Sequence, residues 1–520
     1  MALHFLSVRQ KADVLFHLLI FAIHNTSLPL NPIKQFAGQT AIYGLPTIVG
    51  RLLNYLLVPM YTRLFLPAEY GVVSELYAYV SFLFVLLTYG METAFFRFAQ
   101  DNDHKGNVYS TALLSILGTS AIFVLLTTVF SNNIAGWLGY SNHREYIIWF
   151  ALILTFDVIS VIPFANLRQQ NKAMKFALIK STWICINIGL NLFFILLCPY
   201  ISSHSNNQML KMLVSAIYNP NIGVGYIFIS NLIASAVILL ILGIEIIKVR
   251  FTFNGILLKK MLKYAWPLLL FSFAGIINET FDRIILKHLF PESSDPMAQL
   301  GIYGACYKIS ILMTLFIQTY RYAAEPFFFQ KAKSNDAKVL YADMMLYFVI
   351  ICTLIFLGVM LYIDQVMHFV GKEYRVGEPV VPILLMANLC LGVFYNLSIW
   401  FKLTDKTIYG AFISIFGAAV TLVLNFSLIP AMGIMGAAWA TFICYASMMA
   451  ISYIIGQKYY PVKYDLSKIL GYLGLAVLIY KISGWVDLHG LLKYGFNTML
   501  LLSFISVVAF TMKKSTIRTA

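Results

Sequence analysis

Charged side chains inside long apolar stretches are the residues of this chain most able to do chemistry. Arg51 lies near the middle of the apolar stretch 38–66, where a cation costs roughly 2.5 to 3.5 kcal/mol even if it can reach the interface. The same stretch carries residues that bend helices or let neighbouring helices approach closely, namely Gly38, Gly44, Pro46, Gly50 and Pro59. The pattern predicts that Arg51 faces a polar cavity among helices that can rearrange.

Other charged residues also lie inside apolar stretches or at their rims. The cations are Arg97, Arg283, Lys308 and Arg321, and the acids are Glu92, Asp157, Glu279, Asp282 and Glu325. Glu279 with Arg283, and Arg321 with Glu325, are four residues apart, so each pair could simply neutralise itself on one helix face. Arg51 and Asp157 have no opposite charge within a turn, which makes them the sharper candidates for a cavity site.

The composition identifies the protein class. Hydrophobic residues make up 60% of the 520 residues and charged residues 11%, whereas a soluble domain has about 25% charged residues. The chain is therefore predicted to be an all-α polytopic membrane protein. Its six cysteines lie in or beside apolar runs without metal-ligand spacing, so we expect neither a metal site nor a cofactor.

Apolar runs of spanning length predict about fourteen transmembrane helices. They lie near 41–62, 72–96, 109–130, 146–166, 177–198, 224–247, 264–286, 301–325, 340–362, 379–400, 408–429, 433–455, 468–483 and 494–511. We expect a six-helix lobe at 34–250, a second at 251–458, and an appended helix pair with a cytoplasmic tail at 459–520. Residues 1–33 are expected to form a loose or interfacial extension, because their apolar run is too short to span a membrane.

The distribution of lysine and arginine predicts the orientation. On the side of the N-terminus the loops carry 24 of the 37 basic residues, and the loops on the opposite side carry 8. Because loop cations resist translocation, both termini are predicted to be cytoplasmic. The formal net charge of +15 is therefore mainly a topology signal. These cations form no continuous basic stripe, so we expect no nucleic-acid partner.

The chain also repeats internally. Blocks in the first half recur in order in the second half, with Tyr70-Gly71, Glu92 and Phe95-Phe96 matching Tyr303-Gly304, Glu325 and Phe328-Phe329, and with Asn171-Lys172 and Asn191 matching Asp405-Lys406 and Asn425. Because six helices return the chain to the same side, the two lobes should be parallel repeats about an axis along the membrane normal, with a cavity between them.

The segment PMYTRLFLPAEYGVVS at 59–74 and the segment ETAFFRF at 92–98 resemble the Wzx-type oligosaccharide flippases. These form the polysaccharide biosynthesis branch of the multidrug/oligosaccharidyl-lipid/polysaccharide exporter superfamily. The resemblance covers the chain from about residue 34 to its end, and its specific part is the loop from Tyr61 to Gly71. It implies two lobes in the bacterial inner membrane that move a polyprenyl-diphosphate-linked glycan to the outer leaflet for surface polysaccharides such as lipopolysaccharide.

The resemblance also implies a cationic central cavity for the diphosphate. Arg51 and Arg321, and less directly Arg97 and Arg283, lie where such residues would be, and arginine suits this role because it holds phosphate bidentately and stays protonated. Polar residues expected to contact sugar hydroxyls are Tyr43, Asn54, Asn187, Gln318 and Tyr320. Membrane lipids are expected partners, and a glycan polymerase or glycosyltransferase is a further candidate partner.

Without a nucleotide-binding motif, transport should be driven by an ion gradient or the membrane potential. The acids that could bind a coupling proton or sodium ion are Asp157, Glu92, Glu279 and Glu325. Asp157 is the foremost candidate because it lies mid-span without a local cation, although a hydrogen bond to a neighbouring helix would explain it equally well.

Two other function classes are less consistent with the sequence. A multidrug cation antiporter would share the fold but needs an acidic, aromatic cavity, whereas this chain has an excess of intramembrane arginine. A polytopic enzyme normally presents carboxylates or histidines on a large extramembrane loop, and the long outward loop at 200–222 carries one histidine and no acid. The sequence shows no zinc or nucleophile motif either, so we expect no catalytic role.

Overall fold

The computed structural model describes residues 49–99, 105–247, 252–290, 295–332, 334 and 336–519. Within these ranges the chain forms helices and turns and no strand. The predicted extension at 1–33 and the first part of the predicted span 41–62 lie outside them. The predicted division near residue 250 stays a prediction, and we use it here to name an N-terminal and a C-terminal lobe.

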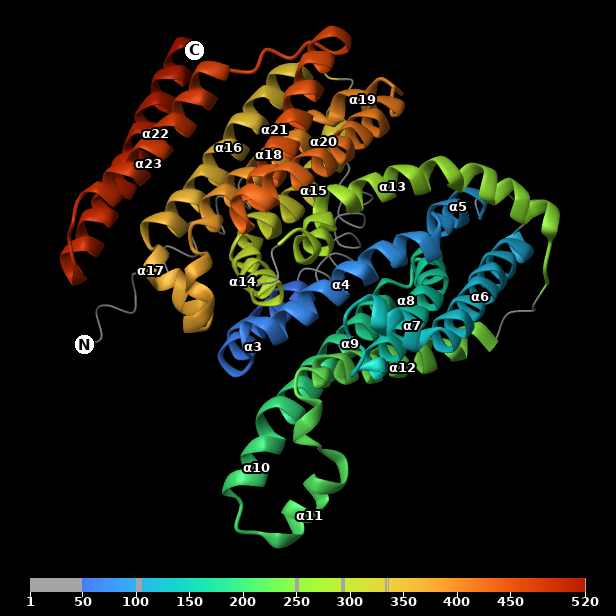
Figure 1. Cartoon of the computed structure of the whole chain (residues 1–520). Coiled ribbons are helices and arrows are strands. Elements are labelled where there is room, and N and C mark those ends of the chain that lie inside the picture. Colours follow the sequence, from blue (N-terminus) through green and yellow to red (C-terminus); the bar gives the residue numbers. More distant parts are fainter. Residues whose placement is uncertain are drawn as a thin grey trace.

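The N-terminal lobe begins with helical residues 49–56. Its further helices are α3 Val58–Leu64, α4 Pro67–Thr88, α5 Met91–Phe98, α6 Lys105–Val129, α7 Ser131–Trp137, α8 Arg144–Gln169, α9 Ala173–Leu192, α10 Cys198–His204, α11 Gln208–Ile217 and α12 Gly225–Ile247, with the π-helical turn η2 Phe193–Leu197 between α9 and α10 and the short η3 Pro220–Ile222 before α12. In Figure 1 the hairpin of α10 and α11 projects away from the rest of this lobe.

The C-terminal lobe begins with the longest of the described helices. Its helices are α13 Gly255–Leu289, α14 Pro296–Ile309, α15 Ile311–Lys331, α16 Ala337–Leu361, α17 Ile363–Val366, α18 Val380–Leu397, α19 Ile399–Leu403, α20 Ile408–Met432 and α21 Ile434–Tyr459, with the short turns η5 Met367–Phe369 and η6 Lys372–Gly377. The appended pair is α22 Leu466–Trp485 and α23 Gly490–Thr519, which lie side by side against the edge of this lobe (Figure 1).

These helices confirm the predicted fold class. In the described ranges, 12 helices are long and apolar enough to cross a membrane, or up to 13 if the bent pair α14 and α15 counts as one span. Each predicted span from 72–96 onward coincides with one continuous candidate membrane span or, at 301–325, with the bent pair α14 and α15. The count of fourteen is not confirmed, because the first predicted span lies partly outside the described residues.

The backbone supports the internal repeat. Asn171 and Asp405 both adopt left-handed backbone conformations, with φ of 56° and 55°, which residues other than glycine rarely do. Each lobe also joins the inner ends of two helices by an ion pair, Glu92 with Arg168 in the first lobe and Glu325 with Lys402 in the second. The acids are 233 residues apart and the bases 234, so the matching blocks of sequence build matching contacts.

Glycines bring the two lobes together on the predicted outer side. A Cβ on Gly71 of α4 would lie 2.1 Å from the carbonyl oxygen of Met297, and one on Gly301 of α14 would lie 1.9 Å from that of Pro67. These repeat-related helices therefore cross backbone against backbone, as only glycine allows. Hydrogen bonds add to this closure, because the Gly371 amide donates to the Thr62 hydroxyl at 3.0 Å and the Tyr374 hydroxyl donates to the Phe65 carbonyl at 2.9 Å.

A buried ion pair joins the lobes on the same side. The Lys287 ammonium at the end of α13 lies 3.2 Å from the carboxylate of Glu75 on α4, whose side chain is fully buried. Lys287 also donates to the Leu138 carbonyl at 2.5 Å, and the Tyr140 hydroxyl donates to Glu75. Burial, together with the Glu75 carboxylate, raises the pKa of Tyr140 well above its usual value, so Tyr140 stays neutral and keeps its proton for this bond.

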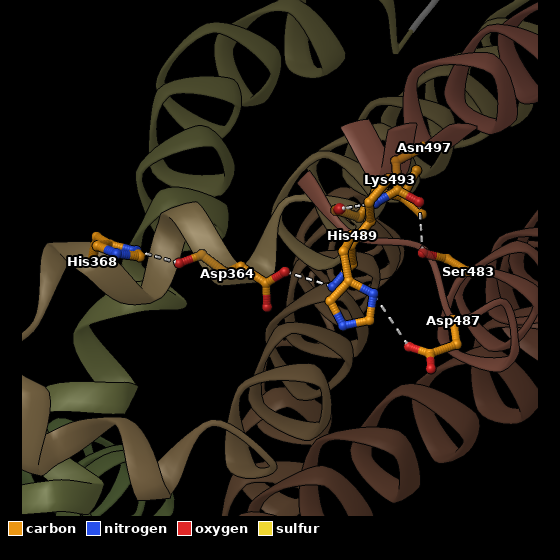
Figure 2. Close-up of polar contacts among 8 residues, drawn as sticks. Asp364, His368, Ser483, Asp487, His489, Lys493 and Asn497 are labelled. Carbon is orange, nitrogen blue, oxygen red and sulfur yellow. Dashed lines mark hydrogen bonds and ion pairs between the residues drawn. The ribbon is translucent and has the colours of Figure 1, made fainter. Parts of the chain in front are cut away.

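Polar contacts attach the appended pair to the end of α16. Figure 2 shows Asn497 between Ser483 and the C-terminal lobe, and Lys493 directed at Asp364 of α17. The Asn497 amide donates to the Leu361 carbonyl at 2.5 Å and accepts from the Ser483 hydroxyl at 2.7 Å. The Lys493 ammonium lies 2.5 Å from the Asp364 carboxylate. The pair is therefore anchored at a defined register on the predicted outer side.

We predict that Gly301→Ala destabilises the protein by about 1–3 kcal/mol, because the new methyl group forces α4 and α14 apart. Thermal unfolding of the purified protein measures the effect. Gly118→Ala is the matched control, since a Cβ there has no neighbour within 4 Å. Equal unfolding temperatures for Gly301→Ala and the wild type would contradict the close crossing.

We predict that Lys287→Met lowers the free energy of unfolding by about 3–5 kcal/mol, because it leaves the buried Glu75 carboxylate on the closed outer side without its cation. Adding Glu75→Gln should recover part of that loss, since the remaining group is then neutral. Unfolding of both single variants and the double variant tests this coupling. Purely additive losses would show that the two side chains do not interact.

Candidate functional site

A central cavity of about 330 Å³ lies between the two lobes. The N-terminal lobe contributes residues of the first helical segment, α3, α4, α9 and α12, and the C-terminal lobe contributes residues of α13 and α14. On α14 its lining residues follow the crossing at Gly301, and on α4 they begin beside Gly71, at Tyr70, and continue after it. The outer closure therefore adjoins the cavity and separates it from the predicted outer side.

The charges of this cavity all lie on the wall formed by the C-terminal lobe. Arg283 and Lys308 line the cavity, and none of its described lining residues is acidic. The Arg283 guanidinium carbon lies 3.9 Å from the Tyr307 ring centre, and its Nε has no hydrogen-bond partner within the described part of the chain. The Lys308 ammonium makes no ion pair or hydrogen bond with any described residue. This wall can therefore accept an anion.

The opposite wall is uncharged and carries amides and hydroxyls. Its polar members include Asn54, Tyr61, Tyr77, Asn187, Asn191 and Asn231. The Tyr61 hydroxyl donates to the Asn191 side chain at 2.8 Å, and the Asn231 amide donates to the Tyr77 hydroxyl at 2.9 Å. Amide and hydroxyl groups both donate and accept hydrogen bonds, so this wall suits a neutral polar ligand such as a sugar.

A second cavity of about 390 Å³ lies within the N-terminal lobe. It is lined by Glu92, Asp157, Arg168 and Lys180, among other residues, and shares Trp183 with the central cavity. Asp157 accepts a hydrogen bond from the Ser235 hydroxyl at 2.7 Å. The Lys180 ammonium lies 4.4 Å from the Phe164 ring centre. Two acids and two bases therefore surround one polar space inside a membrane lobe.

The corresponding place in the C-terminal lobe is nearly filled, with a cavity of about 20 Å³. Arg321 lies over the Tyr395 ring at 4.0 Å from its centre, and Glu325 forms its ion pair with Lys402. The Tyr320 hydroxyl donates to Asn396 at 2.8 Å. The two lobes therefore differ here in the space that they leave around similar charges.

The structure separates the four predicted diphosphate contacts. Arg283 lines the central cavity and Arg321 lines the small cavity of the C-terminal lobe. Arg51 and Arg97 are exposed and line none of the three cavities described above. No observation here tests their contact with a substrate, so the assignments of Arg51, Arg97 and Arg321 stay predictions.

The predicted coupling acids are separated in the same way. Asp157 and Glu92 line the second cavity and Glu325 lines the third, while Glu279 is exposed on α13. The local pairs considered from the sequence do not describe the contacts made. Arg283 reaches the backbone carbonyl of Glu279 at 3.5 Å, and Glu325 pairs with a base on another helix.

Lys308 is the cavity residue that sequence reasoning left without a role. A usable signal exists, because Lys308 follows Gly301 and Gly304 at helical spacing and so lies on the face that contacts the other lobe. A Cβ on Gly304 would lie 2.4 Å from the Ser74 hydroxyl of the N-terminal lobe. No cluster of described residues could hold a metal ion.

Comparison with known proteins places the chain in a family. A family model described as polysaccharide biosynthesis protein matches residues 37–332. Among curated proteins, none matches this sequence.

Solved structures share the fold. The lipid II flippase MurJ, in an inward closed conformation, is 13% identical with a TM-score of 0.66, and the match covers 90% of this chain and 99% of that one. An inward-facing multidrug resistance MATE family transporter of the MOP superfamily is 14% identical with a TM-score of 0.62, covering 81% and 97%. An outward-facing conformation of a transporter with the same description has a TM-score of 0.54 at 14% identity, covering 81% and 94%.

At these identities the structures establish a common fold and nothing finer. The family match is of another kind, because it rests on the sequence itself and spans more than half of the chain. It includes the loop from Tyr61 to Gly71 that carried the resemblance. The chain belongs to the polysaccharide biosynthesis protein family.

Proposed function

We propose that this protein is a flippase that moves a polyprenyl-diphosphate-linked oligosaccharide from the cytoplasmic to the outer leaflet, for cell-surface polysaccharide biosynthesis. The observation that carries the proposal is the division of the central cavity into a cationic wall and an uncharged polar wall. Arg283 and Lys308 would compensate the diphosphate, and the amides and tyrosines would replace water around the first sugars. Family membership and the shared fold with a lipid II flippase support it.

The cavity chemistry disfavours a multidrug cation antiporter. The fold alone does not separate the two functions, because MATE transporters share it. A cationic drug in the central cavity would face Arg283 and Lys308 and would find no carboxylate among the described lining residues. Like charges in a setting of low dielectric repel strongly, so an anionic headgroup suits the site better.

Alternating access gives the contacts on the outer side a role. In this conformation Gly71, Gly301 and the pair of Glu75 with Lys287 hold the lobes together on the predicted outer side. Release of a glycan to the outer leaflet requires these contacts to separate as the lobes rock. The predicted inner-membrane location and cytoplasmic termini complete this scheme.

We predict that Arg283→Ala slows translocation of a polyprenyl-diphosphate-linked oligosaccharide in proteoliposomes by roughly 10- to 100-fold, as expected for a lost charge-assisted hydrogen bond. Arg283→Lys should recover part of the rate, since the charge stays but the planar fork is lost. Lys308→Ala should also slow transport.

Lys211→Ala is the control, because Lys211 is exposed on α11 and lines none of the cavities described above. Wild-type rates for Arg283→Ala and Lys308→Ala together would remove the cationic wall from the mechanism. Alanine variants of Arg51, Arg97 and Arg321 in the same assay would show which predicted contacts act on substrate.

We predict that a proton or sodium gradient, or the membrane potential, drives transport without ATP. Moving one charge through the field is worth about 2.3 kcal/mol per 100 mV, enough to bias a rocking equilibrium. Asp157→Asn should abolish the response to the gradient. The other three acids are weaker candidates for the coupling ion, because Glu92 and Glu325 already form ion pairs and Glu279 is exposed. Translocation that ignores all gradients but requires ATP would refute this coupling.

A further inference from the structure

A hydrogen-bonded partition separates the second cavity from the central cavity. Trp183 lines both cavities, Asp157 lines the second, and Tyr77 and Asn231 line the central one. Ser235 on α12 lies between them. We propose that the Ser235 hydroxyl relays the protonation state of Asp157 to the central cavity, so that substrate and proton compete. This inference rests on the proposed function and assigns its regulation.

The Ser235 hydroxyl lies near two hydrogen-bond acceptors. Its hydroxyl oxygen lies 2.7 Å from Asp157 Oδ1 and 3.5 Å from Asn231 Oδ1, and it accepts a hydrogen bond from Trp183 Nε1 at 3.3 Å. A serine hydroxyl has one proton to donate and two lone pairs that accept. Two acceptors therefore compete for one proton, and the ionised carboxylate wins because charge-assisted bonds are shorter and stronger.

Protonation of Asp157 reverses this preference. A proton that enters from water in the second cavity turns the carboxylate into a carboxylic acid, which donates to the free lone pair of the Ser235 oxygen. Ser235 keeps its own proton, which rotates toward Asn231 Oδ1. No other atom changes its proton count. The neutral form of Asp157 thus leaves Asn231 Oδ1 occupied, and the ionised form leaves it free.

The state of Asn231 matters to a ligand in the central cavity. Asn231 lines that cavity, and its amide donates to the Tyr77 hydroxyl at 2.9 Å. Without a bond from Ser235, Asn231 Oδ1 offers both of its lone pairs to sugar hydroxyls, whereas the bond from Ser235 takes one of them. Ionised Asp157 therefore favours bound glycan. By linkage, bound glycan lowers the proton affinity of Asp157 by the same factor.

The surroundings of Asp157 suit a proton site in the first lobe. The titratable and charged groups that face it are Lys180 of α9, Glu92 of α5, Tyr77 of α4 and Arg168 of its own helix. At the repeat offset of 234 residues, the position equivalent to Asp157 is Leu391. The relay therefore belongs to the N-terminal lobe and has no acid in the equivalent position of the other lobe.

Equilibrium binding of a short-chain polyprenyl-diphosphate-linked oligosaccharide to the full-length protein in nanodiscs tests the relay. We expect wild-type binding to tighten at least about fivefold from pH about 5.5 to about 8. Ser235→Ala should bind tightly at both pH values, because Asn231 Oδ1 is then always free. Asp157→Asn, whose amide can donate like the acid, should bind weakly at both. Ser235→Thr keeps the hydroxyl and should keep the pH dependence.

A relay therefore predicts tight binding by Ser235→Ala and weak binding by Asp157→Asn. A purely structural role of these residues would weaken binding in both variants. Ser235→Ala with a wild-type pH dependence, or with uniformly weaker binding, would overturn the proposal. A dependence on sodium concentration at fixed pH, with no dependence on pH, would overturn the assignment of the proton.

A second readout needs no substrate. The pH titration of Trp183 fluorescence, taken as wild type minus Trp183→Phe, should show a transition that Asp157→Asn and Ser235→Ala both lose. If the wild type binds no lipid-linked glycan at any pH, the proposed function fails. The fluorescence titration still decides the relay, and a transition that persists in both variants would refute it.

Discussion

The cost of placing charge in hydrocarbon determines where the polar groups of this protein lie. Two ion pairs reduce that cost by joining helices that are distant in sequence, Glu75 with Lys287 between the lobes and Glu325 with Lys402 within the second lobe. Arg283 and Lys308 differ, because they bring cations to a cavity without a described acid among its lining residues. A protein keeps such charges where an anion or water completes their surroundings.

The contacts that close the lobes on the predicted outer side lie next to the charged central cavity. The glycine crossing of α4 and α14 and the buried Glu75 place a tight seal beside the central cavity. The seal consists of close backbone contacts, one buried ion pair and the hydrogen bonds that Gly371 and Tyr374 donate to the first lobe. In the proposed cycle of alternating access, this seal opens while the cationic wall compensates the charge of the diphosphate.

The fold and part of the candidate site could be predicted from the sequence. Apolar run lengths predicted the helices, because a bilayer of about 30 Å imposes them. The repeat could be recognised in the sequence because matching positions such as Asn171 and Asp405 adopt the same left-handed backbone conformation, which favours similar residues. The contacts between the lobes could not be predicted from the sequence, because their partners are far apart in it. Lys287 and Glu75, for example, are separated by 212 residues. Charges close in sequence, such as Arg321 and Glu325, suggested local ion pairs. In the structure each contacts a residue on another helix instead, Arg321 the Tyr395 ring and Glu325 the Lys402 ammonium. Which cations line the central cavity therefore depended on packing.

The proposed function depends on the binding of an anionic headgroup in the cavity between the lobes. This binding can be measured at equilibrium with the wild-type protein in nanodiscs. Three ligands with the same chain length and the same glycan are compared: a polyprenyl diphosphate conjugate, its monophosphate and its uncharged ether. Binding should weaken stepwise from the diphosphate to the ether, by roughly tenfold or more for each lost charge-assisted contact. Equal binding of all three, or tighter binding of a hydrophobic cation such as ethidium, would contradict it.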